Sequence, residues 1–324
     1  MHDGANGARA SSAPALSKVA TTQAELAEHG EQNTKTVSSL WLALILAAGV
    51  VAASSSAIFA RLADAPGVVV AAYRMSVASL LFLPWTVRAW QREPLNRRGL
   101  GLAVAAGVFL GMHFATWISS LSYTSVAIST TLVNTNPLWV TFFMWIFAAK
   151  RPAAKVFAAV CLAIMGGVLI AMDGGGEGSR PFWGNSLALL GALTVSAYFL
   201  LGRAAQRSGL SLQAYAGLAY ATAALVLLPM PALLAMPYSG YPPLLWLWIV
   251  LMALVPQLLG HTSFNYALKY LDPTLVSTVI LLEPLGASLL AVLLFSEFPS
   301  LLSALGALVL LAGVLLTVRY SPKA

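Results

Sequence analysis

Ten long apolar runs constrain this sequence more than any other feature. Each is about as long as the roughly 20 residues that a helix needs to cross a bilayer, and they lie near 39–60, 67–87, 100–121, 124–148, 154–172, 183–202, 211–235, 243–267, 273–295 and 300–318. Hydrophobic residues make up 59% of the chain and charged residues 9%, which lies outside the range of soluble proteins. The runs therefore predict an all-α membrane protein with ten transmembrane helices.

An internal repeat divides these runs into two halves. The stretch Trp117–Pro137 returns in degenerate form at Phe264–Pro284, with every aligned pair 147 residues apart, including Asn136 with Glu283. A repeat of about 150 residues is too long for a solenoid unit, and in a membrane protein it indicates duplicated halves around a central site. We expect a first repeat at 38–173, an external linker at 174–182 and a second repeat at 183–320. The polar residues 1–37 should form a disordered cytoplasmic tail.

The distribution of positive charge predicts the orientation. With the N-terminus in the cytoplasm, fifteen of the 18 Lys and Arg residues lie inside, two lie outside (Arg61 and Arg180), and Arg74 lies within a span. Cytoplasmic connections carry the excess of such residues, which favours an N-in, C-in topology. Because five spans per half is an odd number, the second half should enter the membrane upside down, as an inverted repeat.

Glu283 is the one acidic residue that we place inside a span, near the membrane midplane. A carboxylate at that depth costs several kcal/mol unless it is protonated, paired or hydrated, so it is a candidate proton-coupling residue. Pro284 follows it and breaks the helix there, as Pro137 does after Asn136 in the first half. A structural, protonated Glu283 is the alternative.

Polar side chains within the spans are the candidate substrate ligands. Gln257, His261 and Asn265 recur at every fourth residue of the eighth span, and this spacing predicts one polar face of a helix that points into the bundle. The remaining candidates are His113, Trp117, Asn134, Asn136 and Tyr198. Interhelical hydrogen bonding or packing is the alternative for each, and Trp117 could be an ordinary interfacial aromatic.

The position of Arg74 allows two interpretations. It lies some seven residues inside the second span, so its head could snorkel to the membrane surface. Alternatively it is a charge partner for Glu283 or for an anion in the cavity.

The sequence shows no chemical motif of an enzyme or of a cofactor site. HExxH, GxSxG, P-loop and CxxC patterns are absent, and no two intramembrane carboxylates could share acid and base roles. We therefore expect no catalytic residues, no metal and no cofactor. The net charge of +7 is scattered over short connections, so the membrane explains it better than nucleic acid does.

Three stretches carry a resemblance to a known family: ARLADAPGVVVAAYRMSVASLLFLP, HFATWISSLSYTSVAISTTLVNTNPLWV and NYALKYLDPTLVSTVILLEPLGASLLAVLLFSE. They resemble the EamA-type branch of the drug/metabolite transporter superfamily. The resemblance implies ten helices in two inverted halves, with the fifth and tenth outside a central cavity, and export of small metabolites without ATP. Arg74 falls where the family has its span-two arginine. Lys150 departs from the family's usual Glu, which Glu297 keeps in the second half.

The expected function is therefore a bacterial inner-membrane secondary transporter that exports a small metabolite of the amino acid or derivative class by alternating access. Its partners would be the substrate and the lipid bilayer, and we expect no nucleic acid. Whether it forms a homodimer is left open by the sequence. The alternatives are a channel or sensor and a membrane-embedded enzyme that modifies lipids.

Overall fold

A computed structural model describes residues 38–94, 96–124, 126–173, 179–295 and 300–321. All regular secondary structure in these residues is helical, as the sequence predicts. The chain divides into two compact units, Met1–Leu42 and Ala43–Ala324, and all contacts below lie within the second. The predicted disordered tail, part of the linker and Glu297 fall outside the described residues.

The helices follow one another with short connections. In chain order they are α2 (Ser39–Leu62), α3 (Gly67–Arg92), α4 (Arg97–Ser120), α5 (Val126–Val133), α6 (Asn136–Ala148), α7 (Ala154–Asp173), α8 (Pro181–Arg207), α9 (Leu212–Leu227), α10 (Met230–Leu233), α11 (Leu244–Met252), the π-helix η1 (Ala253–His261), α12 (Thr262–Tyr270), α13 (Pro273–Ile280), α14 (Glu283–Phe295) and α15 (Leu301–Tyr320).

Eight of the helical segments in the described residues are long and apolar enough to cross a membrane, whereas the sequence predicts ten. The predicted span 124–148, which consists of α5 and α6 with a break at Asn134–Thr135, is not among these eight. The apolar part of α7, Ala154–Ile170, is shorter than the other candidates. The protein is thus a multi-pass membrane protein, and the number ten remains a prediction.

Short polar side chains begin several helices at the turns that the sequence marks. The side chain of Asn96 accepts a hydrogen bond from the Arg98 amide at the start of α4, and Ser211 accepts one from Ala214 at the start of α9. Asp272 caps α13 in the same way. These caps satisfy amides that the first turn of a helix leaves without a partner.

The repeat in the sequence is also a repeat of helix boundaries. Adding 147 to the bounds of α5, α6 and α7 gives the bounds of α13, α14 and α15 residue for residue. The shared break between α5 and α6, and between α13 and α14, precedes Pro137 and Pro284. Because proline has no amide hydrogen, the carbonyl four residues earlier loses its helical partner, and the helix is interrupted at this point.

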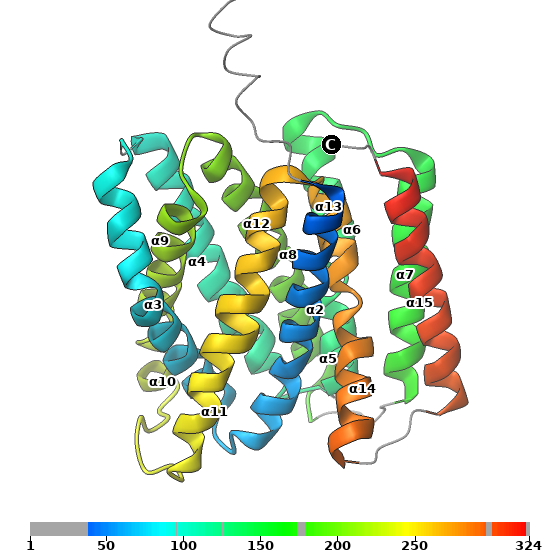
Figure 1. Cartoon of the computed structure of the whole chain (residues 1–324). Helices are drawn as coiled ribbons and strands as arrows, with labels where there is room; N and C mark the ends of the chain where they lie inside the picture. Colours follow the sequence, from blue (N-terminus) through cyan, green and yellow to red (C-terminus); the bar gives the residue numbers. More distant parts are fainter. Residues whose placement is uncertain (1–37, 95, 125, 174–178, 296–299, 322–324) are drawn as a thin grey trace, which may run out of the picture. The chain divides into compact units, whose positions relative to one another are not determined.

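Helices α7 and α15 pack against each other through glycines (Figure 1). A Cβ on Gly166 would lie 2.3 Å from the amide nitrogen of Leu310, and one on Gly313 would lie 2.3 Å from that of Ala163. The contact partner moves back along α15 as the position advances along α7, so the two helices are antiparallel. Small residues of this kind let membrane helices approach at backbone distance.

Candidate functional site

A cavity of about 50 Å³ lies where both halves of the chain meet. Helix α4, the break between α5 and α6, and helices α8, η1, α12 and α13 contribute to it. Its lining combines polar and aromatic groups with aliphatic ones: His113, Trp117, Val133, Asn134, Asn136, Val195, Phe199, His261, Phe264 and Ile280. Five of the eight predicted substrate ligands are among them, and Tyr198, Gln257 and Asn265 are not.

The helix break brings both predicted asparagines to the cavity. On an uninterrupted helix Asn134 and Asn136 would point about 200° apart, but α5 ends at Val133 and α6 begins at Asn136, so the two line the same space. The backbone carbonyl of Asn136 accepts a hydrogen bond of 3.1 Å from the Ser196 hydroxyl of α8. This bond anchors the break to the second half.

His113 and Trp117 form an aromatic wall on α4. Their rings are stacked, with centroids 5.8 Å apart and planes 13° from parallel. His113 Nδ1 lies 2.9 Å from the carbonyl oxygen of Gly191, so the ring donates its proton from Nδ1 to α8. Gly191 leaves room for this wall, since a Cβ there would be 3.2 Å from the Cβ of Trp117. Trp117 therefore faces the cavity rather than acting only as an interfacial aromatic.

Of the predicted polar face of Gln257, His261 and Asn265, the structure places only His261 in the lining of this cavity. Residues Ala253–His261 form a π-helix with Pro256 inside it. Gln257 and Asn265 are fully buried against other helices and are not among the cavity-lining residues. The shared polar face of the three residues stays a prediction.

Three lining residues carry buried polar atoms without hydrogen-bond partners among the described residues. They are the indole Nε1 of Trp117, the amide Oδ1 of Asn136 and the ring Nδ1 of His261. A buried polar atom without a partner costs free energy. These atoms supply both donor and acceptor capacity, so the cavity suits a polar ligand or water.

Comparison with known proteins gives the family. The model of the EamA-like transporter family matches residues 39–172 and 182–319. The chain belongs to this family. Two uncharacterized transporters of Archaeoglobus fulgidus are each 26% identical to it, over 254 and 247 residues that cover 76% of this chain and 85% and 84% of theirs. The uncharacterized transporter YxxF of Bacillus subtilis is 22% identical over 238 residues, which are 72% of this chain and 75% of that protein.

A solved structure supports the same fold. It is described only as "Crystal structure of protein", and it superposes with a TM-score of 0.73 at 18% identity, over 88% of this chain and 98% of its own. At this identity the likeness concerns the fold alone. The EamA-like chain is thus a membrane transporter by family and by its apolar helices.

Arg74 of this EamA-like transporter does not snorkel to the surface. It is 2% exposed, and its guanidinium donates to Gln257 Oε1 at 2.8 Å and to Ser56 Oγ at 3.1 Å. The guanidinium carbon also lies 4.7 Å from the ring centroid of Phe114, a cation–π arrangement. Sequence reasoning missed Phe114, whose ring also meets that of His261 edge to face, with centroids 5.8 Å apart. The Phe114 ring thus contacts both the buried cation and a cavity-lining histidine.

Asn265 and Tyr198 belong to a buried cluster of hydrogen bonds. Asn265 Nδ2 donates to the hydroxyls of Tyr198 at 2.6 Å and Tyr220 at 3.3 Å, and its carbonyl accepts a bond from Gln206 at 2.9 Å. The cluster joins α8, α9 and α12 on one side of the cavity. For Tyr198 and Asn265, these contacts favour interhelical hydrogen bonding, which is the alternative to binding substrate.

Glu283 begins α14 directly after the helix break, where the positive end of the helix dipole favours an anion. The Ser54 hydroxyl donates to its backbone carbonyl at 3.1 Å. Its carboxyl group is close enough to Arg74 for an electrostatic interaction, although no ion pair between them is found in the described part of the chain. Glu283 is not among the cavity-lining residues. The described residues contain no cluster of three or more His, Cys, Asp or Glu that could hold a metal.

Proposed function

We propose that this transporter is a secondary exporter of a small polar or amphipathic metabolite, of the amino acid or derivative class, in the bacterial inner membrane. The observation that carries the proposal is the composition of the cavity wall. His113, Trp117, Asn134 and Asn136 come from the first family match, and His261 comes from the second. A central site between two repeats is where secondary transporters bind their substrates.

The size of the cavity favours alternating access. At about 50 Å³ it holds one or two waters, whereas sites for small molecules measure roughly 300–1,000 Å³. A substrate therefore binds only after the halves move apart on one side. Profiling an overexpressing strain for export of, and resistance to, amino acids, amines and toxic analogues tests the proposal. No change in export or resistance for any of these compounds would contradict it.

We further propose that the two halves are inverted relative to each other. The antiparallel contact of α7 and α15, which hold equivalent positions 147 residues apart, supports this. Reporter fusions after Lys150 and after Lys269 should both be cytoplasmic, and fusions within 238–242 should be periplasmic. A cytoplasmic signal from fusions within 238–242 would contradict the inverted arrangement of the two halves.

For the driving force, we propose that Glu283 loads and releases a proton as the cavity alternates between the two membrane faces. Glu283→Gln keeps the shape of the protonated side chain but cannot release a proton. It should abolish accumulation driven by a pH difference and preserve substrate exchange between equilibrated vesicle compartments. Asp64→Asn, which removes an exposed carboxylate from a connection, is the matched control and should accumulate substrate normally.

The outcomes separate coupling from transport itself. If Glu283→Gln still accumulates substrate against its gradient under a pH difference, coupling through Glu283 is wrong. If the wild type shows unsaturable flux between vesicle compartments, a channel replaces the exporter. If the purified protein forms product without vesicles, the alternative of an enzyme is favoured.

A further inference from the structure

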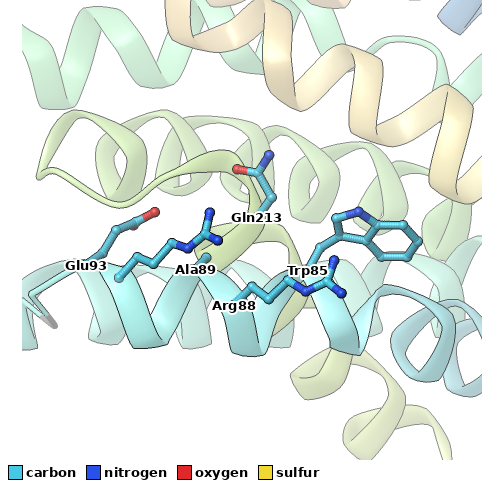
Figure 2. A pocket seen from close by; sticks show the side chains of 6 residues that line it. Trp85, Arg88, Ala89, Glu93 and Gln213 are labelled. Carbon is cyan, nitrogen blue, oxygen red and sulfur yellow. The ribbon is translucent and has the colours of Figure 1, made fainter.

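A second and larger cavity lies away from the central one, at the end of α3. It measures about 380 Å³ and is lined by Trp85, Arg88, Ala89, Arg92, Glu93 and Gln213. Figure 2 shows Trp85 and Arg88 extending along α3 with Gln213 of α9 opposite them. We call this cavity the α3–α9 notch. It shares no lining residue with the central cavity.

The notch exists because α3 and α9 touch closely on one side of it. A Cβ on Gly217 would lie 1.7 Å from the hydroxyl oxygen of Thr86, so only glycine permits this approach. Thr86 is buried at the contact. One turn further along α3, the buried Ala89 has too small a side chain to fill the space between the helices. The gap that remains opens beside Arg88 and Arg92.

The charge in the notch is positive on balance, because two arginines face one carboxylate in its lining. Arg88 and Arg92 lie four residues apart and thus on one face of α3, and both are exposed. No ion pair or hydrogen bond of either guanidinium is found in the described ranges. The one acid in the lining, Glu93, accepts a 3.0 Å hydrogen bond at Oε2 from the Ser211 amide and forms no ion pair with either arginine in the described ranges. An anion with several acceptor oxygens would satisfy both arginines.

The side chains along one face of α3 change from apolar to charged toward the C-terminal end of the helix. Leu81, Trp85, Arg88 and Arg92 follow one another at helical spacing, and the first two are exposed hydrophobics, with Trp85 at 52%. Tryptophan at this position is typical of the level of the lipid headgroups. The Arg88 and Arg92 end of α3 is the end that the charge distribution assigns to the cytoplasm. The notch therefore lies at the headgroup level, with apolar surface leading from it toward the hydrocarbon.

We propose that the α3–α9 notch binds the phosphate headgroup of an anionic phospholipid of the cytoplasmic leaflet. Arg88 and Arg92 hold the phosphate, Gln213 contacts the polar headgroup, and Trp85 and Leu81 border the first acyl carbons. Basic pockets between membrane helices on the cytoplasmic side are suited to such headgroups. Free phosphate shares the charge of the headgroup but gains nothing from the apolar part of this face of α3, and this favours the lipid as the source.

Native mass spectrometry of the purified full-length protein with added phosphatidylglycerol or phosphatidylcholine tests the proposal. Wild type should bind phosphatidylglycerol preferentially. The double variant Arg88→Gln/Arg92→Gln should bind it about 25-fold more weakly, at roughly fivefold for each arginine near an anionic headgroup. The matched control is Arg97→Gln/Arg98→Gln, which removes two exposed charges at the start of α4, outside the notch lining, and it should bind phosphatidylglycerol like wild type. An unchanged gel-filtration profile verifies that each variant is folded.

Equal binding by wild type and the Arg88→Gln/Arg92→Gln variant overturns the proposal, and so does an equal loss in the Arg97→Gln/Arg98→Gln control. A further arm distinguishes lipid from free anion. Trp85→Ala should weaken phosphatidylglycerol binding and leave competition by inorganic phosphate unchanged. If millimolar inorganic phosphate displaces phosphatidylglycerol completely from wild type and Trp85→Ala binds lipid normally, the notch is a site for free phosphate and the lipid assignment is wrong.

Discussion

Gly166 and Gly313 lie at the closest approach of α7 and α15, where an alanine has no room. A Cβ on Gly166 would be 2.3 Å from the Leu310 nitrogen and 2.6 Å from the Gly306 oxygen. A Cβ on Gly313 would be 2.3 Å from the Ala163 nitrogen. All of these neighbours are backbone atoms, so no side-chain rotation can relieve the contact. Gly166→Ala and Gly313→Ala should therefore push the two helices apart.

The magnitude follows from these distances. Nonbonded heavy atoms separate to about 3.5 Å, so the backbones must move apart by roughly 1 Å. Overpacking of this kind costs about 1–3 kcal/mol. The higher helix propensity of alanine offsets up to about 1 kcal/mol of that cost. With the full offset, we expect each variant to be destabilised by up to about 2 kcal/mol, and by similar amounts, because the two glycines hold equivalent positions in the packing.

Thermal unfolding in detergent, followed by fluorescence-detected gel filtration, measures the effect. The control is Gly167→Ala, where a Cβ meets no atom within 4 Å. This neighbour should be neutral or slightly stabilised by the same gain in helix propensity, and its melting temperature should exceed that of Gly166→Ala by several degrees. If Gly166→Ala and Gly313→Ala melt at or above the temperature of Gly167→Ala, the antiparallel glycine contact is refuted.

Two further predictions concern the centre of the molecule. In a Cys161→Ala background, His261→Cys should react with small polar thiol reagents, and transported substrate should protect it. Leu308→Cys on α15 should not react. If His261→Cys fails to react under every condition, the cavity is closed to solutes. Gln257→Leu should destabilise the protein by about 1.5–3 kcal/mol because it removes an acceptor from the buried Arg74 guanidinium. In the same thermal assay Gln91→Leu, at an exposed site, should change little, and equal melting of the two variants would contradict the role of that bond.

The sequence alone determined the class of fold and the position of the helix break in each half. Long apolar runs leave helices as the way to satisfy the backbone in lipid, and helices are what the described chain forms. The two prolines after Asn136 and Glu283 predicted a break in each half, and both breaks are present. These features depend on the chemistry of local sequence, since a proline lacks its amide hydrogen wherever it lies.

The tertiary structure decided which polar groups meet. Of Gln257, His261 and Asn265, only His261 lines the central cavity, because Gln257 and Asn265 are taken up by hydrogen bonds to Arg74 and to Tyr198 from other helices. The position of Arg74 in its span was compatible with snorkelling, and its burial depends on Ser56 and Gln257, which come from two other helices. The α3–α9 notch likewise requires α9, whose Gln213 is remote from Arg88 in sequence. Pairings between distant helices are set by packing, and the apolar periodicity of a single span carries no information about its partner.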